Sequence, residues 1–347
     1  MKKIVMLLVF SLLSVSAALA VKVTTLYQGV LPVSSQSAAE RNQLASQALA
    51  QVLIKVSGNN DILNHPKVKA RLDSAARLMQ EFSYATGLPG ETKPYLLQLN
   101  FDADGVNKIL RDAGAPIWGQ NRPLLLVWLE NEAPRHPAEI IGADSGNRLP
   151  IWLKQATDRR GVPVIFPAMD MEDLAQVSVN DMVTMNVPKL MNAAKRYGSD
   201  AILIGRILQN PAGYETQWKL IMGNDQWGWN ITGQTVPDIL AAMADHVAET
   251  LAGRYATVIT NTVQSNLTLK IIDVAQADDF VQVMNYIKHL TPVASVQLLQ
   301  ISGSDMLLRV SLRGTQESFV QALSVGQKLT PAGSSSEQTT LIYQWNH

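Results

Sequence analysis

Hydrophobic and polar positions follow helical and strand periods in three successive stretches of the chain. In the first, residues 21–118, apolar side chains recur at helical spacing over residues 44–56, behind a Ser37-Ala-Ala-Glu40 capping-box pattern. Gly58 is expected to end this helix. The pattern also predicts strands at 23–27 and 95–101, an amphipathic helical stretch over 65–82 and a short helix over 104–113.

The second stretch, residues 119–256, alternates in the way that is typical of an α/β domain. Residues 123–129 form a continuous apolar run of the kind that is buried on both faces of a sheet. The predicted order is βαβαβββα. The later elements are helices at 150–160 and 187–197, strands at 162–166 and 201–208, a hairpin and a long helix at 236–255.

The third stretch, residues 267–347, follows a linker at 257–266 that has few charges and no helical stripe. It predicts strands at 267–272, 293–301, 306–312 and 341–345, helices at 277–290 and 315–325, and a flexible loop at 331–336. This βαββαβ order is typical of a ferredoxin-like sandwich. We therefore expect an α/β and α+β protein of three small domains, the last of them ferredoxin-like.

The first twenty residues have the pattern of a secretory signal peptide. Lys2 and Lys3 precede an apolar run over residues 4–15, and the small residues Ala18 and Ala20 frame a cleavage site. The run is too short and wrongly flanked for a membrane span, and a buried first strand would not need the two lysines. We expect cleavage after Ala20 and a periplasmic protein.

Charge and cysteine content exclude several functions. Without Lys2 and Lys3 the chain has 27 basic against 29 acidic residues, so it has no electrostatic reason to bind nucleic acid or anionic lipid. With no Cys, thiol catalysis, thiolate metal sites, disulfides and a lipid-anchoring Cys are excluded. No later apolar run approaches about 18 residues, which predicts a mature chain without a transmembrane segment.

Two clusters resemble metal sites but have simpler explanations. Asp102-Ala-Asp104-Gly105 matches the start of a calcium loop, yet Arg111 stands where the loop needs a bidentate Glu. We expect Asp104 to cap the following helix instead. His246 and Glu249 share a helix face, but the other histidines, His65, His136, His289 and His347, lie far apart along the chain. No metal is predicted.

No recognised nucleophile or phosphate-binding motif occurs in the chain. Asp170, Glu172 and Asp173 cluster after the strand at 162–166, at its carboxyl end, where open α/β sheets often bind ligands. A loop that caps the next turn is the simpler interpretation. The alternative is an envelope hydrolase, which would need a second carboxylate with a raised pKa.

Trp218, Trp227 and Trp229 raise the hypothesis of an aromatic platform for glycans or peptides. A two-residue turn at Asn224-Asp225 would pair Trp229 with Leu220 and Trp218 with Ile231, which places these side chains on one face. Since the opposite face is polar, we expect the tryptophans to face the core.

Two basic residues lie within apolar strands. Arg206 and Lys270 could each anchor an anionic group. An exposed or edge position is far commoner for such residues, so neither is assigned to a site.

Three segments carry a family resemblance: residues 41–58, the run Arg-Pro-Leu-Leu-Leu-Val-Trp at 122–128, and Gly-Ser-Asp-Ala-Ile-Leu-Ile-Gly-Arg at 198–206. Together they resemble the proteobacterial exported family called domain of unknown function 2066, over most of the mature chain. This resemblance implies no activity and no catalytic residues.

Residues 197–205 and the Trp hairpin are also similar to a small α/β domain of envelope proteins. That domain occurs in the N-terminal part of the Tol translocation protein, in curli secretion proteins and in lipoprotein activators of penicillin-binding proteins. The helix at 41–58 is similar to the N-terminal domain of the flagellar T-ring protein. These likenesses imply a protein-binding role in the cell envelope.

The sequence thus favours a non-enzymatic periplasmic protein-binding or envelope-assembly factor. Its partners are expected to be envelope proteins, and no catalytic, cofactor-binding or metal-binding residue is assigned. A hydrolase that uses carboxylates and a carrier of small ligands, with an apolar cavity between domains, remain as alternatives. The oligomeric state is left open.

Overall fold

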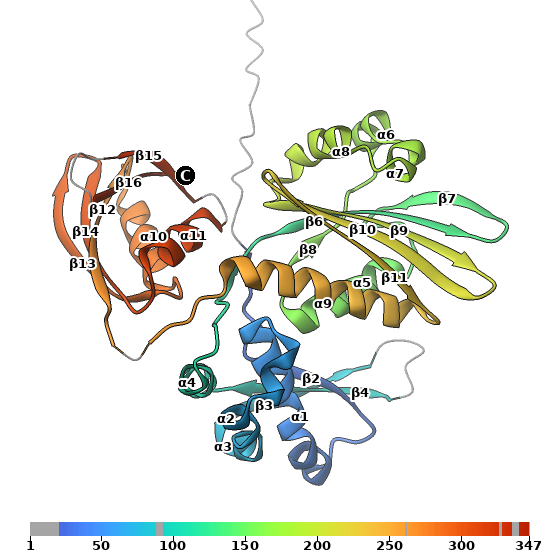
Figure 1. The fold of residues 1–347 in the computed structure, drawn as a ribbon, viewed down its shortest axis with the longest axis horizontal. Coiled ribbons are helices and arrows are strands. Elements are labelled where there is room, and N and C mark those ends of the chain that lie inside the picture. The colour runs from blue at the N-terminus through green and yellow to red at the C-terminus, as the bar shows by residue number, and fades with distance from the viewer. Residues whose placement is uncertain (1–20, 88–92, 261, 326–327, 335–339, 347) are drawn as a thin grey trace, which may run out of the picture.

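The computed structural model describes residues 21–87, 93–260, 262–325, 328–334 and 340–346. The expected signal peptide at 1–20 lies outside these residues. The described residues form three sheets of three or more strands in sequence order, each packed against helices (Figure 1), and one two-stranded sheet, which confirms the mixed α/β and α+β class. No helix among the described residues combines the length and hydrophobicity needed to cross a membrane.

The N-terminal sheet has the order β2-β4-β3, with antiparallel neighbours. Leu97, Leu99 and Phe101 alternate along its middle strand and are buried against helix residues such as Leu49 and Val52. The elements are β2 (Gln28–Val33), β3 (Met79–Thr86), β4 (Tyr95–Phe101), α1 (Ala38–Ser57) and α4 (Ala103–Ala113).

The ends of α1 follow the local sequence signals. The Ser37 side chain accepts the backbone N–H of Glu40, but the predicted capping box is incomplete, because the Ser37 N–H donates to Ser35 Oγ and not to Glu40. The Glu40 carboxylate accepts the N–H groups of Ser34 and Ser35, which lowers its pKa. Gly58 ends the helix with φ 73°, a left-handed conformation that glycine adopts without strain.

Two predictions for this region are wrong. The expected strand at 23–27 is a turn, and β2 begins at Gln28. The expected helical stretch at 65–82 is broken into short helical turns, after which the chain enters β3. Pairing of β3 with β4 satisfies its backbone groups and overrides the helical periodicity. The short elements are η1 (Asn60–Asn64), α2 (Pro66–Lys69), η2 (Leu72–Ser74) and α3 (Ala75–Leu78).

The central sheet has the order β11-β10-β9-β6-β7, and β8 also pairs with β6. Strands β6 and β9 are parallel, whereas β9, β10 and β11 form an antiparallel meander. The strands are β6 (Leu125–Ala133), β7 (His136–Ile141), β8 (Val164–Ile165), β9 (Ala201–Asn210), β10 (Gly213–Met222) and β11 (Asp225–Gly233).

Helices cover both faces of this sheet (Figure 1). The long helices α5 (Leu149–Arg160) and α9 (Val236–Tyr255) pack on one face. Three short helices, α6 (Met171–Gln176), α7 (Val179–Val183) and α8 (Val187–Ala194), lie over the other. Strand β7 and helices α6 and α7 were not predicted. The expected strand at 162–166 keeps only two paired residues, β8.

The C-terminal sheet has the order β13-β14-β12-β16-β15, with both helices on one face (Figure 1). It fits the predicted βαββαβ ferredoxin-like arrangement. Residues 331–334, predicted as a loop, instead lie in the extra edge strand β15, and 335–336 lie outside the described residues. The elements are β12 (Ser265–Ile272), β13 (Val293–Ser302), β14 (Asp305–Leu312), β15 (Leu329–Ser334), β16 (Thr340–Trp345), α10 (Ala277–Lys288) and α11 (Gln316–Ser324).

A short pairing between β1 (Val21–Lys22) and β5 (Asn121–Arg122) lies between the N-terminal and central sheets. There Arg122 is fully buried and donates hydrogen bonds to the carbonyl groups of Lys55 on α1 and Arg160 on α5. This single side chain therefore links helices that belong to two different sheets.

Candidate functional site

The acidic cluster predicted at residues 170–173 lies at the start of α6, where it forms an ion-pair network. Asp170 caps the helix, since its Oδ1 accepts the N–H groups of Glu172 and Asp173, both at 3.1 Å. Arg196, beyond α8, donates to both oxygens of Asp170 at 2.8 Å. This bidentate geometry is the strongest form of an arginine–carboxylate pair.

Asp173 is fully buried behind this pair, and each of its oxygens accepts a hydrogen bond. The Tyr197 hydroxyl donates to Oδ2 at 2.6 Å, and the Met169 N–H donates to the same oxygen at 2.9 Å. Arg196 donates to Oδ1 at 3.1 Å. Met169 itself has φ 55°, a strained value for a side chain of this size, so the network also holds an unusual backbone turn.

These contacts move the pKa values of Asp170 and Tyr197 away from neutral pH. The Arg196 guanidinium holds the pKa of Asp170 well below its usual range. Burial, together with the hydrogen bond to Asp173, raises the pKa of Tyr197 to about 12. Asp170 therefore stays ionised and is not the carboxyl group with a raised pKa that a carboxylate hydrolase would need. The network instead fixes α6 in place, which agrees with the helix-capping interpretation.

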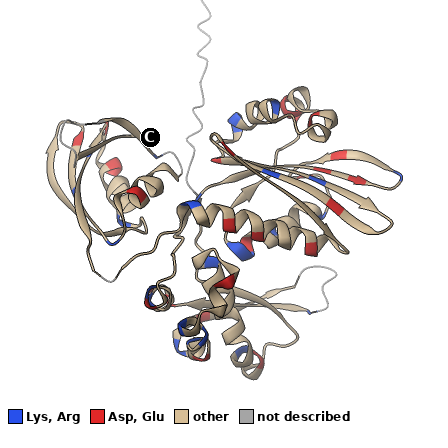
Figure 2. Ribbon diagram, viewed as in Figure 1, with Lys and Arg blue, Asp and Glu red and all other residues tan. Residues whose placement is uncertain are grey.

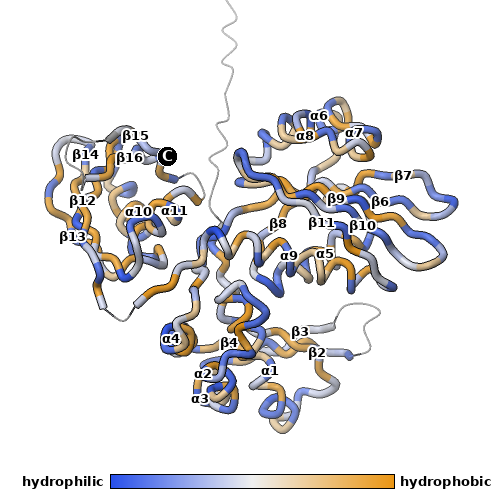
Figure 3. Tube along the Cα trace, in the orientation of Figure 1, coloured by the Kyte–Doolittle hydropathy of each residue, from blue (hydrophilic) through white to orange (hydrophobic). Residues whose placement is uncertain are grey.

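Helix α6, fixed in this way, exposes apolar side chains. Met171 is 89% exposed and Leu174 is 62% exposed, one turn apart on α6. Val183 on α7 and Met191 on α8 are 42% and 40% exposed. We call these four side chains the α6–α8 surface; Figure 3 shows the hydrophobic segments of the three helices. The inner side chains of the same helices, among them Leu190, pack on β6 and β9.

A groove opens beside Met191, between α8 and the start of β9. Its volume is about 330 Å³, and Met191, Ala194, Ile202 and Ile221 contribute apolar atoms to its walls. A groove of this size can hold one or two side chains of a partner, and it also lies at the lower end of the volumes of small-ligand pockets. Sequence reasoning missed this surface because α6 and α7 were read as loop; the spacing of Met171 and Leu174 was the available signal.

The Trp hairpin faces the core, as predicted. Trp218 is 2% exposed, and both Trp227 and Trp229 pack against the core cluster of the sheet. The register differs by two residues from the prediction, because Trp218 pairs with Trp229 and Leu220 with Trp227. A shift of two leaves every side chain on the same face, which is why the predicted facing is correct.

His246 and Glu249, the other pair that resembled a metal site, make separate contacts with different residues. His246 stacks on Trp229 with ring centroids 5.7 Å apart, while Glu249 accepts a hydrogen bond from Asn60 at 3.1 Å. Within the ranges that the structure describes, no group of three or more His, Cys, Asp or Glu side chains is placed to hold a metal.

The calcium-like segment forms a helix cap, but with a different residue from the one expected. Asp102, not Asp104, caps α4: its Oδ2 accepts the Gly105 N–H at 3.0 Å. The helix therefore begins one residue before the predicted start, because Asp102 lies outside the helix with a ψ of 116° and Asp104 lies within the first turn.

Both basic residues within strands are ion-paired. Arg206 donates to Glu130 at 2.7 Å, and Lys270 contacts Asp305 at 2.8 Å. Neither cation is left to anchor an anionic ligand. Basic and acidic positions are interspersed over all three sheets and their helices (Figure 2).

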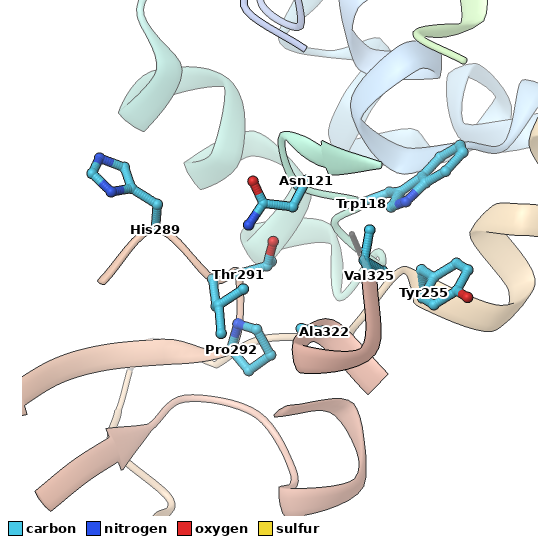
Figure 4. Close-up of a pocket in the computed structure, with 10 residues that line it drawn as sticks. Trp118, Asn121, Tyr255, His289, Thr291, Pro292, Ala322 and Val325 are labelled. Carbon is cyan, nitrogen blue, oxygen red and sulfur yellow. The ribbon is translucent and has the colours of Figure 1, made fainter. Parts of the chain in front are cut away.

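A crevice lies between the central and C-terminal sheets (Figure 4). Its volume is about 20 Å³, which is room for one water molecule and far below that of a ligand pocket. Trp118, Asn121 and Thr291 line it, and the buried nitrogens Trp118 Nε1 and Asn121 Nδ2 have no hydrogen-bond partner among the described residues. This junction therefore does not provide the cavity that a small-ligand carrier would need.

Comparisons with known proteins add one family match. Residues 20–119 match the family model described as "Domain of unknown function (DUF8605)". A domain of unknown function is what the sequence motifs implied, although this family has another number and covers only the N-terminal part. No curated protein matches the chain.

Two solved structures show faint similarity. TolB from Acinetobacter baumannii is 12% identical, with a TM-score of 0.24, and the match covers 57% of this chain and 38% of that one. A competence-damaged protein (CinA) superfamily protein from Enterobacter cloacae is 11% identical, with a TM-score of 0.22, and the match covers 41% of this chain and 82% of that one. These values carry no argument about fold or function.

Proposed function

We propose that this protein is an exported, non-enzymatic protein-binding factor of the cell envelope, and that its α6–α8 surface contacts the partner. The observation that carries the proposal is the exposure of Met171, at 89%, on a helix that is held by the bidentate pair between Asp170 and Arg196. An apolar side chain that is both exposed and firmly positioned is typical of a binding surface.

The chemistry of the surface favours a protein over a small ligand. Methionine side chains are flexible and polarisable, so Met171 and Met191 can adapt to the shape of a partner. The groove beside Met191 is open to solvent and combines apolar walls with the polar side chains of Lys195, Ser199 and Asp200, which suits an inserted side chain of a partner protein. The partner is therefore a protein that presents exposed apolar side chains.

The envelope location is supported by sequence. Residues 1–20 have the pattern of a cleavable signal peptide, with Lys2 and Lys3 before the apolar run and Ala20 at the expected cleavage site. Membership of the exported family called domain of unknown function 2066 is part of the same proposal, based on the motifs at 41–58, 122–128 and 198–206. The periplasm is the proposed compartment.

Photocrosslinking in intact cells tests the proposal. A photoreactive residue in place of the exposed Ala175 on α6 is expected to give one discrete adduct with another envelope protein. The same residue in place of Gln217, exposed on β10, serves as the control position and should not give it. Adding the substitutions Met171→Ser and Leu174→Ser should abolish the adduct at Ala175.

The outcome is decisive because the two substituted side chains are largely exposed, so the variant is expected to fold. An adduct that survives Met171→Ser and Leu174→Ser, or one that also forms from Gln217, would remove the α6–α8 surface from the proposal. Absence of any adduct from Ala175 would contradict a protein partner on this surface.

A further inference from the structure

Strand β13 differs from every other long edge strand of the three sheets. Its ten residues, Val293–Ser302, contain neither a charged residue nor a proline. Edge strands usually carry such residues, because they prevent pairing with another chain. The other edge strands each carry at least one: Pro32 in β2, Glu81 in β3, Glu139 in β7, Asp225 in β11 and Pro331 in β15.

The same strand exposes several apolar side chains. Leu298, Leu299 and Ile301 are 36%, 39% and 53% exposed. The strand lies on the outer side of the C-terminal sheet, away from the central sheet (Figure 1). Its outer edge offers backbone N–H and C=O groups that no neighbouring strand of the described chain uses.

The sequence of β13 reads nearly the same in both directions. Residues 295–302 are Ser-Val-Gln-Leu-Leu-Gln-Ile-Ser, a palindrome if Val and Ile are treated as equivalent. Its centre lies between Leu298 and Leu299. An antiparallel pair of identical strands would therefore place like side chains opposite each other: leucine beside leucine, and glutamine beside glutamine.

A β-bulge makes this palindrome compatible with sheet geometry. In a regular strand Gln297 and Gln300, three residues apart, would lie on opposite faces. Leu298 and Gln300 pair with adjacent residues of β14, Leu308 and Leu307, so Leu299 is an extra residue between them. This bulge shifts the alternation of side chains between the two faces by one residue. Gln297 and Gln300 consequently share the open face, opposite Arg309 and Leu307 of β14.

The apolar residues follow the same symmetry. Val296 pairs with Val310, and Ile301 pairs with Met306. Val310 and Met306 are buried on the helix-covered face of the sheet. Val296 and Ile301 are five residues apart and would lie on opposite faces of a regular strand. The Ser, Gln and Val/Ile positions on either side of the centre therefore match in facing, while at the centre Leu298 pairs with Leu308 and Leu299 is the extra residue of the bulge.

We propose that β13 pairs antiparallel with β13 of a second copy of this chain, about a two-fold axis between Leu298 and Leu299. Gln297 then lies opposite the second copy's Gln300, and Val296 opposite its Ile301. The two five-stranded sheets become one sheet of ten strands, and the exposed leucines and Ile301 are covered. The lack of charge on β13 removes like-charge repulsion between the copies.

Analytical ultracentrifugation of the purified full-length chain tests this pairing. We expect the protein to sediment at twice the mass of one chain. Gln297→Glu with Gln300→Glu places like charges opposite each other in two symmetric pairs, which should weaken the dimer roughly tenfold. Gln297→Glu with Gln300→Lys changes the same positions but places opposite charges there, so this matched control should remain dimeric.

Further measurements separate the pairing from a folding defect. A variant with Gln297→Lys and Gln300→Lys is expected to be weakened as well, and mixing it with the doubly acidic variant should restore a dimer. Both variants should keep the melting temperature of the monomer within a few degrees. A protein that is monomeric at all concentrations up to about 1 mM, or a dimer that the like-charged variants leave intact, would overturn the proposal.

Discussion

The guanidinium of Arg122 lies 3.8 Å from the ring centroid of Trp118, fully buried and without a carboxylate within salt-bridge distance among the described residues. Its nitrogens instead donate to five carbonyl groups. Two of these carbonyl groups, those of Lys55 and Arg160, lie in the last turns of α1 and α5, where the helix dipole favours a cation. Burial lowers the pKa of Arg122. The acceptors are the carbonyl oxygens of Lys55, Trp118, Gly119, Arg160 and Gly161.

Replacing Arg122 by lysine should strongly destabilise the protein. Lysine has three donors without the planar fork, so at least two buried carbonyl groups would lose their partner, and the contact with Trp118 would weaken. We expect the free energy of unfolding to fall by roughly 3 to 5 kcal/mol, measured by urea denaturation. Arg159→Lys, at a partly exposed pair with Asp245, is the control and should change it by less than about 0.5 kcal/mol. Equal midpoints for both variants would contradict this role.

Lys55 makes the stability depend on alkaline pH. Its ammonium group is buried against the carbonyl oxygens of Thr25 and Gln28, and burial lowers its pKa from 10.5 to about 8. Between these two values the unfolded chain binds a proton that the folded chain has lost. Stability therefore rises with pH from about 8 towards 10.5, by roughly 2 to 3 kcal/mol in total. Urea denaturation between pH 7.5 and 10 should show this rise.

Two substitutions distinguish Lys55 from the other lysines. Lys55→Met removes the titrating ammonium group, so the free energy of unfolding should no longer rise between pH 8 and 10. Lys154→Met, at an exposed pair with Asp158, should retain it. The assignment to Lys55 fails if both variants keep the same slope, or if wild-type stability declines over this range.

Elements that depend on local signals were predictable, and those that depend on distant partners were not. The ends of α1 follow from Ser37 and Gly58, which act on their immediate neighbours. The strands β3 and β7 are edge strands whose pairing with β4 and β6 comes from tertiary contacts, so no short-range pattern marked them. Strand β15 was mistaken for a loop because Pro331 and Gly333 lie within it.

The binding surfaces were harder to predict than the elements. The uncharged, nearly palindromic sequence of residues 295–302 is visible without a structure, but its position at a sheet edge is not. The α6–α8 surface depends on Arg196 reaching back to Asp170, a contact over 26 residues. The sequence showed the cluster of acidic residues, but it could not show that Arg196 donates hydrogen bonds to Asp170 and Asp173.

Close packing between Gly205 and Trp218 gives a third prediction. A Cβ atom on Gly205 would lie 2.1 Å from Trp218 Cζ3, so Gly205→Ala must displace a buried indole. We expect a loss of roughly 1 to 3 kcal/mol in the free energy of unfolding and a shift in tryptophan fluorescence. Gly228→Ala, on β11 at the other side of the strand that carries Trp218, is the control, because its Cβ would lie 3.6 Å from the Trp218 carbonyl oxygen, an ordinary contact. Similar losses at both glycines would refute this explanation.

The last prediction concerns the attachment of α6. Arg196→Met removes the cation that holds Asp170 and leaves buried Asp173 with hydrogen bonds from Tyr197 and the Met169 N–H alone. We expect amide hydrogen exchange over residues 169–177 to accelerate at least tenfold, while exchange in α9 stays unchanged, because only the local opening becomes easier.

Arg159→Met provides the matched control, since it removes an arginine that is also ion-paired, to Asp245, but on the opposite face of the central sheet. It should leave exchange over residues 169–177 unchanged. If Arg196→Met also leaves that exchange unchanged, the network does not hold α6. Met171 would then be exposed on a helix that is positioned by packing alone, and the argument that the α6–α8 surface is presented in a fixed geometry would lose its physical basis.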